Sequence, residues 1–184
     1  FEGTYEEAVN IFKDLFIDSV KLHLRSDVEV GSALSGGVDS SSIVCVIDQL
    51  LKECGGRQKT FSSCSFDNRY DESDWMKKVI SCTSVDPHYV YPQLEDFYRQ
   101  TENIIWHQEE PYQSQSAFLG YNVFKCAKEN GISVLLNGQG ADEYLGGYGQ
   151  FTGPRYAFLI KKFHFYTLWS DYCSLKKNET IDRK

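Results

Sequence analysis

The chain has 184 residues, enough for one domain with a hydrophobic core and too few for two large ones. Hydrophobic residues make up 41% and charged residues 24% of the sequence, a composition that excludes an intrinsically disordered chain. The formal net charge of −7 disfavours nonspecific binding to nucleic acid or to an anionic membrane, because both are polyanions. We therefore expect one domain over residues 1–184 that binds any anion at a local site.

Cysteine usage and the lack of long apolar runs bear on the compartment. The six cysteines are scattered and show neither a C-x-x-C pair nor a spacing suited to zinc. We expect most of them to be small buried residues of a cytoplasmic protein. No apolar run is long enough for a transmembrane helix, and residues 1–21 lack the apolar region of a signal peptide.

Hydrophobic periodicity predicts the elements in chain order. Thr4 and Glu7 have the spacing of a capping box, so a helix begins there, and its apolar positions continue to about Arg25. A strand at residues 28–34 and a helix that stops at Gly55 and Gly56 follow. Next come a strand at 59–66, a helix through 75–80, a strand at 88–91 and a helix at 94–107.

The later elements complete an alternating pattern. A helix at 116–130 ends at Gly131, a favoured residue after a helix, and leads to an apolar strand at 132–136. Its unbroken apolar character is typical of a fully buried strand in a parallel sheet. Strands that alternate with helices predict an α/β fold, a parallel sheet flanked by helices. From residue 151 the pattern is less regular, and we expect helix as far as Trp169.

A polar segment follows the first predicted strand: Ser35-Gly36-Gly37-Val38-Asp39-Ser40-Ser41-Ser42. Its glycines allow close approach of a ligand, its serines offer hydroxyls, and the next helix offers unpaired N–H groups. These features suit a phosphate. Asp39 would repel a bare phosphate, so an acid here indicates a Mg²⁺ ion between the two. The structural alternative is a glycine-rich turn that caps the helix. Neither a P-loop nor a dinucleotide-binding fingerprint is present.

A second glycine-rich segment follows the strand at 132–136: Asn137-Gly138-Gln139-Gly140-Ala141-Asp142-Glu143-Tyr144-Leu145-Gly146-Gly147-Tyr148. In a parallel sheet it opens at the same edge as the first, so one ligand can contact both. By itself, an Asp-Glu pair among glycines is more often solvated surface. We expect Tyr144 and Tyr148 to serve packing.

The first motif resembles the S-G-G-x-D-S loop, the PP-loop, of the N-type ATP pyrophosphatases, which cleave ATP between its α and β phosphates. With the second motif, G-Q-G-A-D-E-x-L-G-G-Y, it resembles the synthetase domain of the asparagine synthetase B family. The resemblance extends to residues 16–34, 60–66, 70–73 and 109–112. It implies an adenine nucleotide alpha hydrolase-like fold.

The resemblance also implies roles for single residues. The pyrophosphate of ATP would be bound by Ser35, Gly36, Gly37, Asp39, Ser40 and Ser41. The adenosine pocket would be lined by Ala33, Leu34, Ser63, Cys64, Asn137 and Gly138. Mg²⁺ would be held by Asp39 and Asp142, and the catalytic residues would be Asp39, Gln139, Asp142 and Glu143. An aspartate carboxylate would attack the α phosphate, and ammonia would convert β-aspartyl-AMP to asparagine.

Departures from the family pattern leave alternatives open. Many members carry an acid where this chain has Gln139, which cannot take a proton as a carboxylate does. Three hypotheses follow. The acid that reacts is aspartate, or it is another small acid, or the chain is a nucleotide-binding fragment without turnover. A phosphate-facing lysine would fall at Lys161 or Lys162, unless both are solvated. The resemblance implies a glutaminase domain or subunit, which is absent from these residues, and it allows a homodimer.

Overall fold

The computed structural model describes residues 2–52, 54–67, 69, 71–112 and 114–181, with side chains described as far as Lys176. The chain divides into two compact units, Phe1–Gln139 and Gly140–Lys184. The boundary falls inside the second glycine-rich motif, which the sequence analysis treats as one segment. A single domain over residues 1–184 stays a prediction.

The first unit contains a parallel sheet and the helices around it. Its helices are α1 (Tyr5–His23), α2 (Val38–Lys52), α3 (Ser73–Cys82), α4 (Leu94–Gln108) and α5 (Ser116–Glu129). Its strands are β1 (Val30–Ala33), β2 (Lys59–Ser63), β3 (Asp86–Val90) and β4 (Val134–Leu136). The sheet has the order β3-β2-β1-β4, and each neighbouring pair is parallel. The predicted α/β fold with a parallel sheet flanked by helices is confirmed.

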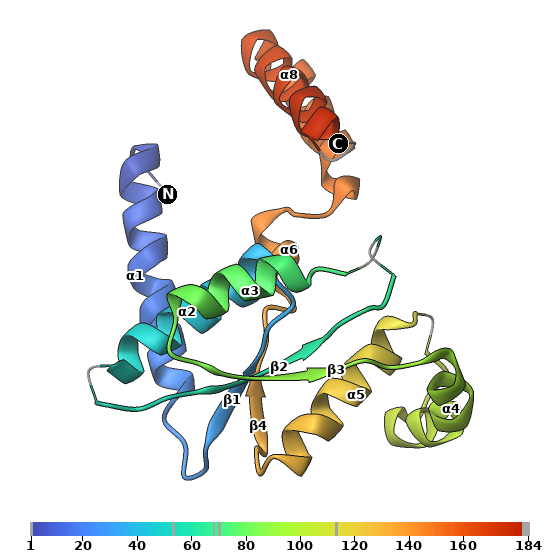
Figure 1. Ribbon diagram of the computed structural model, residues 1–184. Coiled ribbons are helices and arrows are strands. Elements are labelled where there is room, and N and C mark those ends of the chain that lie inside the picture. Colours follow the sequence, from blue (N-terminus) through green and yellow to red (C-terminus); the bar gives the residue numbers. More distant parts are fainter. Residues whose placement is uncertain (1, 53, 68, 70, 113, 182–184) are drawn as a thin grey trace. The chain divides into compact units, whose positions relative to one another are not determined.

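The helices cover both faces of this sheet (Figure 1). On one face α2 packs on β1 and contacts α1 and α3, while on the other α5 packs on β2 and β3 and contacts α4. The capping box predicted at the start of α1 is present: the Glu7 N–H donates to Thr4 Oγ1, and the Glu7 carboxylate accepts from the Thr4 N–H.

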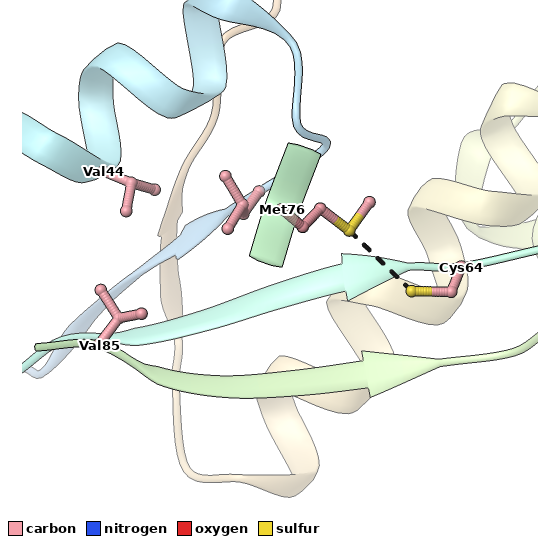
Figure 2. Close-up of a cluster of buried hydrophobic side chains, with 5 residues drawn as sticks. Val44, Cys64, Met76 and Val85 are labelled. Atoms are coloured by element: carbon pink, nitrogen blue, oxygen red, sulfur yellow. Dashed lines mark hydrogen bonds between the residues drawn. The ribbon is translucent and has the colours of Figure 1, made fainter. Parts of the chain in front are cut away.

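Two hydrophobic clusters fill the space between the sheet and its helices. Leu34, Val44, Cys64, Met76 and Val85 form the cluster on the α2 and α3 face, where Cys64 Sγ lies 4.0 Å from Met76 Sδ (Figure 2). The cluster under α5 is formed by Phe61, Val123, Ala127 and Ile132. Because successive residues of a strand point to opposite faces, Ala33 packs with the second cluster and Leu34 with the first.

Buried polar side chains tie β1, β2 and α2 together. Ser32 Oγ donates to Gln58 Oε1 over 2.9 Å, and Gln58 Nε2 donates to the Val44 carbonyl oxygen over 2.7 Å. Ser62 Oγ donates to the Leu34 carbonyl oxygen over 2.7 Å. The three polar side chains are at most 3% exposed, so these bonds satisfy groups that would otherwise be costly to bury.

The prediction that β4 is fully buried is wrong. An apolar run of this kind predicts a strand flanked by others and fully buried, but β4 lies at the edge of the sheet and Val134 is 37% exposed. Within the described part of the chain, β4 pairs with β1 alone. The residues of a strand determine how apolar it is, but its burial depends on the strands and helices that pack beside it.

The regular elements of the second unit are all helices among its described residues. It contains α6 (Ala141–Leu145), the 3-10 helix η1 (Gly149–Phe151), α7 (Thr152–Lys161) and α8 (Phe165–Ile181). Arg155 of α7 donates to an Asp171 carboxylate oxygen of α8 over 2.6 Å. Among the described residues, no helix is both long and apolar enough to cross a membrane.

The cysteine prediction is also wrong for most positions. Cys64 is buried and Cys126 partly so, but the other four cysteines are exposed. Cys45 shows the reason, because the buried stripe of α2 runs through Val44 and Ile47 and leaves Cys45 on the outer side of the helix. Helical phase overrides the general tendency of free cysteine to be buried.

Candidate functional site

The candidate site lies where the order of the strands reverses. β1 is flanked by β2 on one side and by β4 on the other, and the register pairs Ser32 with Leu136. The segments that leave β1 and β4 therefore emerge side by side at the carboxyl edge of the sheet. Ligands of open α/β sheets bind at such reversal points.

The loop after β1 is held in shape by its own serines. Ser35 N–H donates to Ser40 Oγ over 3.2 Å, and the two hydroxyl oxygens lie 2.9 Å apart. Ser35 Oγ also accepts the Gly37 N–H over 3.2 Å, and Ser40 Oγ donates to the Gly37 carbonyl oxygen over 3.3 Å. These bonds hold the loop against the first turn of α2.

The start of α2 offers free donors. The backbone N–H groups of Val38, Asp39 and Ser40 have no acceptor among the described residues, as is usual in the first turn of a helix. Together with the positive end of the helix dipole they favour an anion. Asp39 lies in this turn, and its carboxylate forms no ion pair with any described cation.

Two glycines make the close approaches on which the loop depends. Gly36 has a φ of +89°, and a Cβ there would lie 3.0 Å from Trp75 Cβ and 3.1 Å from the Glu72 carbonyl oxygen. A Cβ on Gly138 would lie 2.7 Å from the Ser40 nitrogen. The segment after β4 therefore rests directly on the backbone of the first turn of α2, where only a glycine fits.

The two segments enclose a cavity of about 260 Å³ in the first unit. Eight residues predicted for the site line it: Ala33, Ser35, Gly37, Asp39, Ser40, Asn137, Gly138 and Gln139. Asn137 Oδ1 accepts the Gln139 N–H over 3.0 Å and so fixes the turn between them. The predicted convergence of the two segments at one edge of the sheet is confirmed for residues up to Gln139.

The acidic part of the second motif belongs to the second unit. A Cβ on Gly147 would lie 1.8 Å from Asp142 Oδ1, so the carboxylate can take this orientation only beside a glycine. Tyr148 Oη donates to Glu143 Oε1 over 2.9 Å, and this bond raises the pKa of Tyr148 above the ordinary tyrosine value. The packing role predicted for Tyr148 leaves out this bond to Glu143.

Comparison with known proteins identifies the family. The family model of asparagine synthase matches residues 12–177. The chain belongs to the asparagine synthase family. The match includes both glycine-rich motifs, the four strands and most of the helices.

Named relatives agree with this membership. A glutamine-hydrolysing asparagine synthetase 1 of Bacillus subtilis is 36% identical over 149 residues, covering 81% of this chain and 23% of the relative. A protein of Methanocaldococcus jannaschii, provisionally named a glutamine-hydrolysing asparagine synthetase 2, is 34% identical over 167 residues, with coverages of 90% and 32%. The amidase chyE of Penicillium rubens is 29% identical over 157 residues, with coverages of 79% and 23%. The chain therefore spans a third or less of the length of these relatives.

Several residues assigned through the family resemblance do not line the cavity. The side chains of Leu34 and Cys64 are 1% and 5% exposed and pack in the core, so a role in the adenosine pocket stays a prediction for their backbone atoms. The cavity lining also omits Gly36, Ser41 and Ser63. Ser41 Oγ is buried without a hydrogen-bond partner among the described residues.

One wall of the cavity is formed by residues that were not among the predicted site residues. Gly120, Val123 and Phe124 of α5 line it opposite the glycine-rich segments. Their spacing puts all three on one face of the helix, which is the signal that the sequence offered.

Two other predicted segments lie outside the cavity lining. Lys161 and Lys162 are exposed in the second unit. The segment at 70–73 is described from Asp71 on, and Asp71 Oδ2 accepts a hydrogen bond from Ser73 Oγ over 2.6 Å.

Proposed function

We propose that this chain is the ATP-binding, amide-forming part of an asparagine synthetase-like ligase. The observation that carries the proposal is the cavity at the strand reversal, where Gly138 of one family motif rests on Asp39 and Ser40 of the other. Both motifs are within the matched region of the asparagine synthase model. The names of the relatives make aspartate the first candidate for the acid.

The proposed reaction has two steps. A carboxylate oxygen of the acid attacks the α phosphorus of ATP, the bond from this phosphorus to the α–β bridging oxygen breaks, and pyrophosphate leaves. The nitrogen of ammonia then attacks the acyl carbon, the bond from that carbon to the AMP oxygen breaks, and a proton is lost from nitrogen. The protein's part is to position the reactants and to stabilise the negative charge that develops.

The described residues suit this chemistry. The free N–H groups of Val38, Asp39 and Ser40 would bind phosphate oxygens. Gln139 lines the cavity and can donate a hydrogen bond through its amide, but it cannot act as a base. The nitrogen therefore loses its proton to another group, and the chemical choices are water or the phosphate group of the departing AMP.

Magnesium fits the site through Asp39. The described residues hold no cluster of three or more His, Cys, Asp or Glu side chains. Such a cluster is not required, because Mg²⁺ commonly binds one or two carboxylates together with substrate phosphates and waters. Asp39 lines the cavity and makes no ion pair with a described cation, and a ligand role for Asp142 stays a prediction from the family resemblance. Bound Mg²⁺ would neutralise pyrophosphate charge.

The test is calorimetric binding of ATP with Mg²⁺. Wild type is expected to bind, and Asp39→Ala is expected to lose at least about tenfold in affinity, the effect of removing a charge-assisted contact. Asp27→Ala is the control, because Asp27 is exposed, lies outside the cavity and carries the same charge. The proposal fails if wild type binds no nucleotide, or if both variants bind alike.

A second candidate keeps the ligase chemistry and changes the acid. Gln139 and the similarity to an amidase of Penicillium rubens favour it. Pyrophosphate release measured with a panel of carboxylic acids separates the two candidates. A glutaminase domain or subunit as the ammonia source, a homodimer and a cytoplasmic location are further parts of the proposal.

A further inference from the structure

A second and larger cavity lies beside the nucleotide cavity in the first unit. It has a volume of about 920 Å³ and is formed between α4 and α5. Ile104 and His107 contribute from α4, and Ala117, Tyr121, Lys125 and Lys128 contribute from α5. Gly120, Phe124 and Gln139 line both cavities, so the two adjoin across these three residues.

The larger cavity has fixed walls. Asn103 Nδ2 donates to Tyr121 Oη over 2.6 Å, and Asn122 Nδ2 donates to Gln100 Oε1 over 3.0 Å, so side chains bridge α4 and α5 at two positions. Ile104 of α4 is 1% exposed, and α4 packs on α5. The space between the helices is therefore part of the folded unit.

Its lining is more apolar than aspartate requires. The side chains of Ile104, Tyr121 and Phe124 and the backbone of Gly120 offer broad apolar surface. Aspartate carries an ammonium and two carboxylates on a short chain, and burying such charges against apolar walls is unfavourable unless they are paired. Ligand sites of this kind favour a molecule with an apolar body and a few placed polar groups.

Charge at this cavity favours an anion. Lys125 and Lys128 are three residues apart on one face of α5, and neither pairs with a carboxylate among the described residues. Glu129 is the acidic residue of the lining, against these two lysines. Two ammonium groups raise the local concentration of a carboxylate near the opening.

We infer that the cavity between α4 and α5 binds the acid substrate of the ligase, and that this acid is a monocarboxylate with an apolar body larger than that of aspartate. The body lies along Tyr121 and Phe124, and the carboxylate reaches Gln139 at the border with the nucleotide cavity. The identification of the ligand as a substrate rests on the proposed function. The cavity and its chemistry do not.

The test fills the larger cavity without touching the smaller one. Ala117 lines the α4–α5 cavity alone, so Ala117→Phe places a ring inside it, and Leu119→Phe adds a ring on the same helix outside both cavities. Binding of phenylacetate and of L-aspartate is measured by ligand-observed NMR, and binding of ATP with Mg²⁺ by calorimetry. Circular dichroism checks the fold, and Ala117→Leu replaces Ala117→Phe if the latter does not fold.

The expected pattern is specific. Phenylacetate binds wild type at least about tenfold more tightly than L-aspartate, and Ala117→Phe weakens phenylacetate about tenfold or more while nucleotide affinity is kept. Leu119→Phe changes neither. Pyrophosphate release with ammonia present then follows phenylacetate rather than L-aspartate.

Three outcomes overturn the inference. L-aspartate binds better than phenylacetate, or Ala117→Phe leaves phenylacetate binding unchanged, or the variant alters self-association in light scattering and no acid binds, which assigns the cavity to a second copy of the chain. Failure of the wild type to bind nucleotide is a separate result, because it refutes the proposed function. Phenylacetate binding would still decide whether the cavity takes an apolar monocarboxylate.

Discussion

The contact of Gly138 with the first turn of α2 allows a quantitative prediction. In Gly138→Ala the new Cβ would lie 2.7 Å from the Ser40 nitrogen and 2.9 Å from Asp39 Cβ. Non-bonded heavy atoms prefer about 3.5 Å, so the two segments must separate by roughly 0.8 Å. The atoms met are mainly backbone, which cannot rotate away as a side chain can. Overpacking of this kind costs about 1–3 kcal/mol.

Urea unfolding followed by circular dichroism measures that cost. With a denaturant dependence of about 2 kcal/mol per molar, the midpoint of Gly138→Ala should fall by roughly 0.5–1.5 M. Calorimetry should show weaker ATP binding, because Asp39 and Ser40 are displaced. Gly153→Ala is the matched control, since a Cβ there meets nothing within 4 Å. Equal midpoints and equal ATP affinities for the two variants would refute the close approach of Gly138.

The remaining predictions concern single contacts. Ser40→Ala removes the hydroxyl that shapes the loop after β1, and should destabilise the protein by about 1–3 kcal/mol in the same urea assay and weaken ATP binding. Gly147→Ala should leave stability nearly unchanged but rotate the Asp142 carboxylate, and so lower pyrophosphate release. Glu143→Gln should lower the pKa of Tyr148 toward the ordinary value in an NMR titration. In wild type the Tyr148 contribution to stability is full below the unfolded-state pKa and is lost as pH rises through the raised folded-state pKa.

The sequence predicted the order and position of the nine elements of the first unit because each has a strong local pattern. The capping box of Thr4 and the apolar periods of α2 and α5 are set by neighbours in the chain. Placement of both motifs at one edge followed from the rule that parallel strands end together. Ser35, Gly37, Asp39 and Ser40 therefore line one cavity with residues 137–139, as expected.

What the sequence could not supply was orientation between elements. The contribution of Gly120 and Phe124 depends on which face α5 turns toward the sheet, and α5 is amphipathic without any mark of a ligand. The edge position of β4 depends on its neighbours, not on its own residues. The core position of Cys64 follows from strand alternation near an irregular strand end, where one residue of shift exchanges the two faces.

The chain of bonds from Ser32 through Gln58 to the Val44 carbonyl has a consequence for nucleotide affinity. It holds α2 on the sheet at Val44, about one and a half turns from the helix end that carries Asp39. If α2 slid along the sheet, the buried Gln58 amide would lose its hydrogen-bond partner. The direction of the free N–H groups is thereby set before any ligand arrives. An incoming nucleotide meets a preorganised surface, and little of its binding energy is diverted to ordering the protein.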